Sequence, residues 1–205
     1  MLPLSMKHIF ENVKDKNIFC NYIEIYNEDV YDLLADEKIK KKLTIKEKDK
    51  IFYVSNVTNK KIETLEDFSF ALNTGVKKKT HAATGLNPNS SRSHTIFKII
   101  LQSNDKSISN ISIVDLAGAE RVKKAETQGV EFTESCKINQ SLSVLGKCFG
   151  VLKDNTLYLN KKIVPFRESK LTMLFQEYFQ GEQNISIIGN INTKDDMQDI
   201  HRVLS

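Results

Sequence analysis

The stretch SISNISIVDLAGAE, residues 107–120, contains the pattern on which the fold prediction depends. Its apolar residues Ile111, Ile113 and Val114 predict a strand, and Asp115 follows them where that strand ends. Three residues later, Gly118 allows the backbone to approach a ligand such as a phosphate closely. This pattern is compatible with a magnesium–phosphate site, but alone it is weak, because an aspartate followed by a glycine turn is more often an ordinary strand end.

Strands and helices alternate along the rest of the chain. We expect helices over residues 5–15, 64–76, 134–152 and 167–178, and strands over 18–26, 51–57, 95–101, 107–116 and 185–191. We expect Asn27 to cap a short helix and Thr193 to cap a final helix. Residues 80–93 are expected to form a polar loop. The alternation predicts an α/β fold, with a central, mostly mixed sheet and helices on both faces.

Composition places the chain among ordinary globular proteins. Its 205 residues fit one domain or part of a larger one, with 27% charged and 40% hydrophobic residues. The net charge of +4 suits an acidic partner. The chain has three cysteines, Cys20, Cys136 and Cys148, and they form no C-x-x-C pair. Their odd number indicates a reduced intracellular setting. No apolar run approaches the roughly 18 residues that a membrane span needs.

A second polar stretch, NPNSSRSH at residues 87–94, complements the first. The hydroxyls of Ser90 and Ser91 are hard oxygen ligands, suited to magnesium and to orienting a water molecule. The guanidinium of Arg92 can form a bidentate pair with a carboxylate, and Glu120 is the candidate partner. Such a pair would join two loops when both close on a phosphate. The alternative is a serine-rich surface turn with a solvated arginine.

NPNSSRSH followed by DLAGAE resembles switch I and switch II of the kinesin motor domain. Three further segments are similar to that family in the expected order. Residues 22–34 are similar to the strand and helix that come after the P-loop helix. Residues 138–146 are similar to the switch II helix, and residues 164–172 are similar to the loop and helix that follow it. The resemblance implies a P-loop NTPase-like kinesin motor core with ATP and Mg²⁺ as cofactors.

The resemblance also implies roles for the magnesium and phosphate residues. Ser91 would contact the magnesium ion, and Ser90 would position the attacking water. Asp115 would order the magnesium shell through water, and Gly118 would donate its backbone N–H to the γ-phosphate.

In the same comparison, Arg92 and Glu120 would form the salt bridge between the switches. Asn87 and His94 would support the nucleotide loop. Ala119 departs from the family, in which many members carry serine, but no role assigned here needs that hydroxyl.

The acidic partner implied by the resemblance is the microtubule. The expected tubulin-facing residues are Arg121, Lys124, Lys137, Arg167 and Lys170. Cationic side chains are attracted to an acidic lattice, which is consistent with this expectation. Any single lysine is equally typical of a solvated surface. The lysines of residues 38–50 and 77–79 are expected in solvated loops or a hairpin. No motif or aromatic interleaving favours nucleic acid as the partner.

No G-x-x-x-x-G-K-[ST] phosphate loop occurs in the 205 residues. The resemblance therefore implies that residues 1–205 are the C-terminal two thirds of a kinesin motor domain, without the P-loop region and neck. The expected function is a cytoskeletal microtubule motor driven by ATP hydrolysis, with this chain alone a poor ATPase. The alternative is a non-catalytic, microtubule-binding motor remnant. A GTPase-like switch is disfavoured by the ordered set of motifs.

Overall fold

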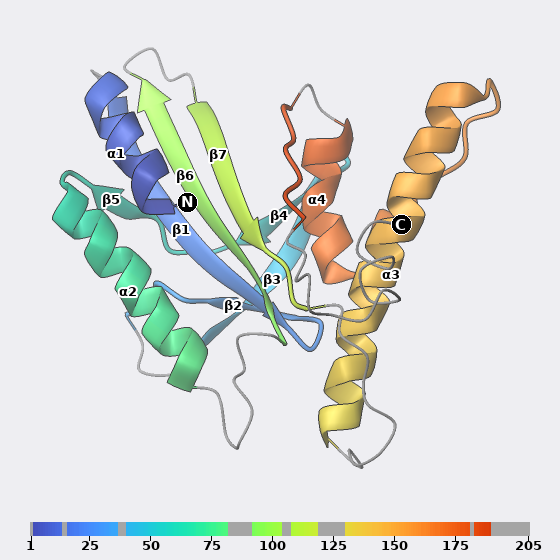
Figure 1. Ribbon diagram of the computed structural model, residues 1–205, viewed down its shortest axis with the longest axis horizontal. Coiled ribbons are helices and arrows are strands. Elements are labelled where there is room, and N and C mark those ends of the chain that lie inside the picture. The colour runs from blue at the N-terminus through green and yellow to red at the C-terminus, as the bar shows by residue number, and fades with distance from the viewer. Residues whose placement is uncertain are drawn as a thin grey trace. The chain divides into compact units, whose positions relative to one another are not determined.

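The computed structural model describes residues 2–13, 16–36, 40–81, 92–103, 108–118, 130–180 and 183–189. It divides into two compact units, one of residues 1–48 and 53–117 and one of residues 49–52 and 118–205. The elements of the first part of the chain are α1 (Leu2–Asn12), β1 (Lys16–Tyr26), β2 (Asp29–Asp32), β3 (Lys41–Lys48), β4 (Ile51–Ser55), β5 (Lys60–Ile62), α2 (Leu65–His81), β6 (His94–Ser103) and β7 (Ile108–Asp115) (Figure 1). They are followed by α3 (Val130–Leu157), the short 3-10 helix η2 (Phe166–Glu168) and α4 (Lys170–Gln180).

The strands form one sheet in the order β4-β3-β2-β1-β6-β7, with β5 also paired to β1. The pairings of β1 with β2, β5 and β6, of β2 with β3, and of β6 with β7 are antiparallel. The longest is β1 with β6, which runs from Lys16 opposite Ser103 to Ile25 opposite His94. Strand β7 pairs with β6 at the end of this order, and its Ile108 is 60% exposed.

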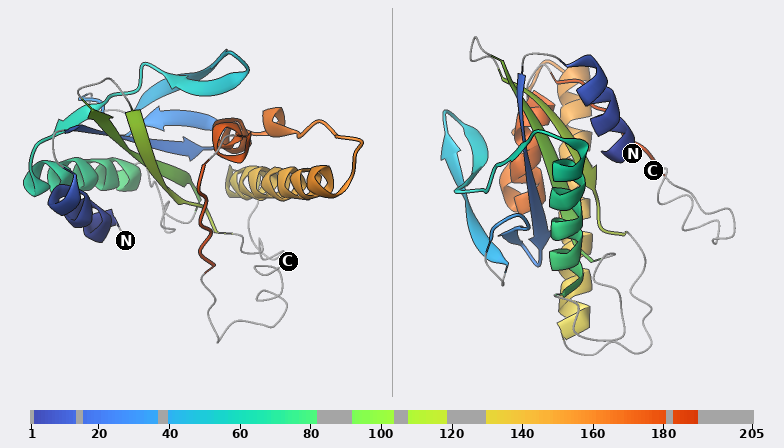
Figure 2. Two further views of the ribbon diagram at one scale, coloured as in Figure 1. Left: turned by 90° about the horizontal axis from the view of Figure 1, so that it is seen from above. Right: turned by 90° about the vertical axis from the view of Figure 1, so that its left-hand side faces the viewer.

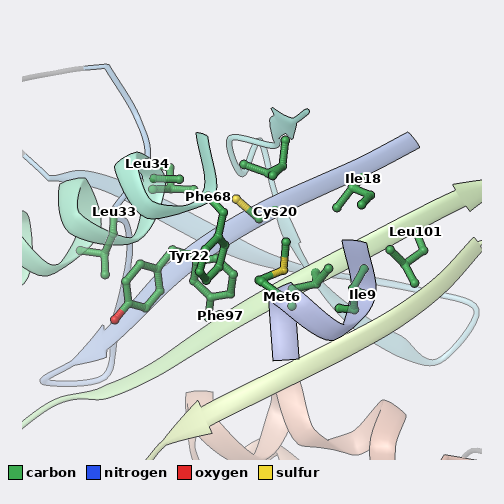
Figure 3. Close-up of a cluster of buried hydrophobic side chains, with 13 residues drawn as sticks. Met6, Ile9, Ile18, Cys20, Tyr22, Leu33, Leu34, Phe68, Phe97 and Leu101 are labelled. Carbon is green, nitrogen blue, oxygen red and sulfur yellow. The ribbon is translucent and has the colours of Figure 1, made fainter. Parts of the chain in front are cut away.

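Helices α1 and α2 lie on the same side of the strands (Figure 2). Alternate residues of β1 and β6 point toward them, because successive side chains of a strand face opposite sides. The buried cluster under the helices draws on all four elements: Met6 and Ile9 from α1, Phe68 and Ala71 from α2, Ile18, Cys20 and Tyr22 from β1, and Phe97, Ile99 and Leu101 from β6 (Figure 3). At its centre, the ring of Phe97 makes edge contacts with Tyr22 at 5.2 Å and with Phe68 at 5.7 Å between centroids.

Helix α2 begins with a reciprocal cap. The Thr64 hydroxyl accepts a hydrogen bond from the Asp67 amide at 3.1 Å, and the Asp67 carboxylate accepts one from the Thr64 amide at 2.9 Å. The backbone amides of Glu63 and Thr64 hold the pKa of Asp67 below its usual value. The helix continues to His81, beyond the predicted end at residue 76, so the stretch 77–79 is helical and the prediction of a loop there was wrong.

The predicted short helix capped by Asn27 was also wrong. Asn27 and Glu28 have positive φ angles of 56° and 63°, and they form the two-residue turn of a hairpin between β1 and β2. After β2, the buried carboxylate of Asp32 accepts hydrogen bonds from the amides of Leu34 and Ala35 at 2.8 and 3.1 Å. These bonds provide acceptors for the backbone amides of the turn, so the turn needs no helical hydrogen bonds.

The second unit contains α3, η2 and α4. Val144 and Cys148 of α3 pack against Phe166 of η2 and Phe179 of α4, which places the three elements around one apolar cluster. Helix α4 is capped by Ser169, whose hydroxyl accepts the Thr172 amide at 3.1 Å. Among the helices of the described ranges, none is both long and apolar enough to cross a membrane.

The predicted strand 185–191 is not a strand where the structure describes it. Residues 183–189 have no regular structure, and Ile185, Ile187 and Ile188 are 47%, 76% and 58% exposed. A strand requires a partner for its backbone groups, and within the described ranges this segment has no ladder partner. The predicted helix after Thr193 lies outside the described residues.

Gly75 is a position at which α2 packs closely against β1. A Cβ at residue 75 would lie 2.2 Å from Cδ1 of the buried Tyr22 ring. We expect Gly75→Ala to lower the free energy of unfolding by about 1–3 kcal/mol, because the packed ring has to move. Denaturant unfolding followed by circular dichroism measures the effect.

Gly146→Ala in α3 is the matched control. An added Cβ there meets nothing within 4 Å, so alanine should raise stability by about 0.5–1 kcal/mol through its helix propensity. Equal stabilities of the two variants would contradict the close packing of α2 on β1.

Candidate site at the junction of β6 and β7

The start of β6 and the end of β7 lie side by side in the sheet. Thr95 is the register partner of Asp115, and Ile96 is the partner of Val114. The last residues of the NPNSSRSH stretch therefore lie beside the first residues of DLAGAE. Two of the predicted site residues, His94 and Asp115, are brought together in this way.

A hydrogen bond joins the two stretches directly. The backbone amide of Ala117 donates to Nδ1 of His94 at 3.0 Å, and both residues are buried. Because Nδ1 accepts this bond, the proton of the neutral imidazole lies on Nε2. His94 thus fixes the backbone just after Asp115.

The environment of His94 favours the neutral form needed for that bond. Burial lowers the pKa of His94 from 6.5 to about 4, with the nearby ammonium of Lys79 acting in the same direction and the carboxylate of Asp115 opposing it. At neutral pH the imidazole is therefore uncharged and available as an acceptor.

Lys79 is a member of the site that the sequence did not indicate. Its side chain is only 9% exposed, and its amine lies 3.5 Å from Oδ2 of Asp115, whose own side chain is 73% exposed. The helix α2 carries Lys79 to this position because it extends to His81. Lysine side chains are rarely this buried unless they are paired. The burial of Lys79 beside a strand-end carboxylate therefore indicates a specific contact, whereas a lysine in a solvated loop would be exposed.

Other predicted site residues are only partly described. Arg92 is half-buried in the bend before β6. Gly118 directly follows Ala117 in the chain and belongs to the second unit. The predicted residues Asn87, Ser90, Ser91, Glu120, Arg121 and Lys124 lie outside the described residues.

Three predicted microtubule-facing residues lie on the second unit. Lys137 is on α3, Arg167 on η2, and Lys170 is the first residue of α4. The guanidinium of Arg167 lies over the ring of Phe52, 4.9 Å from its centroid, which restrains the orientation of this cation.

The described residues suit a magnesium ion that is shared with phosphates. No group of three or more His, Cys, Asp and Glu side chains gathers in the described ranges, so they hold no all-protein metal cage. Mg²⁺ usually keeps several waters and uses one or two carboxylates together with substrate phosphates. The exposed carboxylate of Asp115, held at one oxygen by Lys79, fits a ligand that acts through water.

Comparison with known proteins identifies the family. The model of the kinesin motor domain matches residues 1–205. The chain belongs to the kinesin motor domain family. It is 39% identical over 199 residues to mouse kinesin-like protein KIF23, covering 86% of this chain and 21% of that protein. It is 38% identical over 200 residues to kinesin-related protein 5 of Dictyostelium discoideum, covering 92% of this chain and 20% of that protein.

Solved kinesin structures confirm the α/β motor fold. The motor domain of the Saccharomyces cerevisiae kinesin-related protein KAR3 is similar with a TM-score of 0.69 and 34% identity, covering 89% of this chain and 58% of that one. A structure titled kinesin 6 is similar with a TM-score of 0.69 and 29% identity, covering 87% and 55%. This kinesin chain thus spans about half of these structures and about a fifth of the two relatives named above.

The buried neutral His94 makes stability depend on pH. Its folded pKa of about 4 lies below the value of 6.5 of an exposed histidine, so protonation favours the unfolded state. We expect full stability above pH 6.5 and a loss of up to about 3 kcal/mol as the pH falls to 4. Denaturant unfolding at a series of pH values measures the loss.

His94→Asn retains an acceptor oxygen for the Ala117 amide but does not titrate, so its stability should fall less over the same range. His8→Asn, at an exposed position of α1, is the matched control and should follow the wild-type profile. The account is wrong if His94→Asn and wild type lose the same stability.

Proposed function

We propose that this chain is the switch-bearing part of a kinesin-type motor that couples ATP hydrolysis to movement along microtubules. The observation that carries the proposal is the hydrogen bond from the Ala117 amide to His94, together with the pairing of Thr95 with Asp115. These contacts connect a stretch rich in hydroxyls to a strand-end carboxylate. Membership of the kinesin motor domain family supports the same function.

We further propose that residues 1–205 correspond to the C-terminal two thirds of the motor domain. The sequence carries both switch motifs but no G-x-x-x-x-G-K-[ST] loop. That loop normally cradles the phosphates and supplies the lysine that neutralises them. ATP turnover accordingly requires these residues to act together with a segment that provides the loop.

The proposed nucleotide site uses hydroxyl, carboxylate and backbone groups. Bound magnesium-ATP supplies the phosphoryl group and the cation that offsets its charge. Ser91 would hold the magnesium ion, and Asp115 would order its shell through water. Ser90 would hold the attacking water, while the backbone N–H of Gly118 would donate to the γ-phosphate. Lys79 keeps the Asp115 carboxylate in position through their contact of 3.5 Å.

The switch itself is proposed to be a salt bridge. Arg92 pairs with Glu120 when both stretches close on the γ-phosphate, so the presence of that phosphate becomes a conformational signal. Asn87 and His94 support the nucleotide loop. His94 is suited to this role because its neutral ring already holds the Ala117 amide.

The microtubule is the proposed partner, and the cytoplasmic cytoskeleton the proposed location. The contact residues are Arg121, Lys124, Lys137, Arg167 and Lys170. Their positive charges would accelerate association with an acidic lattice and make affinity fall with salt. A non-catalytic microtubule-binding remnant is the second candidate.

Microtubule-stimulated ATPase activity of the full-length protein tests the proposal. We expect Arg92→Ala and Glu120→Ala each to lower the stimulated rate by about a hundredfold, because each removes a charge that assembles the closed site. Exchanging the two residues, Arg92→Glu with Glu120→Arg, should recover part of the activity.

Lys7→Ala and Glu11→Ala serve as matched controls. They remove the exposed ion pair of α1, in which Nζ and Oε1 lie 3.9 Å apart, and should leave the rate unchanged. A full-length wild-type protein that binds microtubules without any stimulated hydrolysis would favour the remnant over the motor.

A further inference from the structure

A pocket lies along one side of helix α2, within the first unit of the chain. Its volume is about 300 Å³, at the lower end of the range for small-molecule sites. Helix α2 lines it with one stripe of side chains, because the positions follow the helical repeat. They are Asp67, Phe70, Ala71, Thr74 and Lys78. The remaining lining comes from residues 34–36 and from β5, which leads into α2 (Figure 1).

Part of the pocket wall is apolar. Leu34, Ile62 and Ala71 line the pocket and are buried. Phe70 lines the same pocket but is 76% exposed. A ligand with an apolar body would cover part of this ring and displace the water that now contacts it.

Two lysine amines gather at residues 35 and 36 of the lining. Nζ of Lys60 lies 2.6 Å from Oδ1 of Asp36, and the amine of Lys78 donates to the carbonyl oxygen of Ala35. The hydrogen bond from Lys60 is the main cause that lowers the pKa of Asp36, and the charge of Lys78 acts in the same direction. Two ammonium groups therefore share one carboxylate, which leaves one positive charge in excess there.

The other charged groups of the lining have partners of their own. Nζ of Lys61 lies 2.6 Å from Oε1 of Glu63. The Asp67 carboxylate accepts hydrogen bonds from the amides of Glu63 and Thr64 in the cap of α2. Asp67 precedes Lys78 by eleven residues, which is about 16 Å along the helix. An anion is therefore favoured at the end of the pocket that Lys78 lines.

This pocket is separate from the site at the β6–β7 junction. Lys79, which contacts Asp115, is the next residue along α2 after Lys78. Successive residues of a helix point about 100° apart, so the two lysines serve different faces. Neither Lys79 nor Asp115 lines the pocket.

We propose that the pocket binds a small organic acid, a molecule with one carboxylate and an apolar body. The carboxylate lies between the amines of Lys60 and Lys78, and the body lies against Leu34 and Ala71 and extends toward the ring of Phe70. Its single negative charge matches the one excess positive charge. An ammonium group has three N–H donors, so each lysine can bind the anion and keep its present contact. The inference is independent of the proposed function.

The test is a ligand-detected NMR titration of the full-length protein with 4-phenylbutyrate as the probe. Butyrate, which lacks the ring, and 4-phenylbutanol, which lacks the charge, are the matched probes. We expect 4-phenylbutyrate to bind at least about tenfold more tightly than either, because each of the others lacks one part of the recognition.

Variants locate the binding. Lys78→Gln should weaken 4-phenylbutyrate about tenfold and leave 4-phenylbutanol unchanged, since it removes a charged donor, whereas Lys78→Arg should retain most of the affinity. Phe70→Ala should weaken 4-phenylbutyrate but not butyrate. The matched control is Lys77→Gln, at an exposed neighbouring position that does not line the pocket, and it should bind as wild type does. Circular dichroism establishes that each variant is folded.

Four results overturn the inference. One is equal affinity of folded Lys78→Gln and wild type for 4-phenylbutyrate. Another is an equal loss in Lys77→Gln, which would make the effect one of overall charge. Binding of 4-phenylbutanol as tight as that of 4-phenylbutyrate would make the pocket a purely apolar site. Wild type that binds none of the three probes also overturns it, and leaves the proposed motor function standing.

Discussion

Strand β6 is hydrogen-bonded to β1 along one edge and to β7 along the other, and this double pairing determines where the site lies. Ile25 stands opposite His94 in one pairing, and Thr95 stands opposite Asp115 in the other. A shift of one residue would turn Phe97 out of the apolar cluster, so the register is tied to the core. The position of His94 beside the Ala117 backbone thus depends on the packing of Phe97 in the apolar cluster under α1 and α2.

Much of this arrangement could be predicted from the sequence. The strands predicted at 95–101 and 107–116 correspond to β6 and β7, because both stretches are rich in isoleucine and other residues that favour strands. The motifs around them predicted the kinesin family, which the comparisons confirm. The structure brings His94 close to Asp115 and the Ala117 backbone, and the roles assigned to them stay predictions. The assignments of Ser90, Ser91 and Glu120 stay predictions.

Other features depend on contacts that a linear pattern does not contain. Asn27 is equally suited to a helix cap and to a left-handed turn, and the pairing of β1 with β2 decides for the turn. Lys79 belongs to a run of three lysines that looked solvated. Two residues, about 200° around the helix, separate the exposed Lys77 from Lys79, which contacts Asp115. The isoleucines of residues 185–191 predicted a strand, but a strand forms only where its backbone groups can pair with a neighbouring strand.

We propose that phosphate binding at the β6–β7 junction changes the affinity of the full-length protein for microtubules. Measuring the microtubule Kd of the full-length protein with ADP and with a non-hydrolysable ATP analogue tests it most directly. The account predicts at least about tenfold tighter binding with the analogue, a coupling free energy of about 1.4 kcal/mol. The same Kd with both nucleotides would contradict it, and would leave a filament-binding protein without a nucleotide switch.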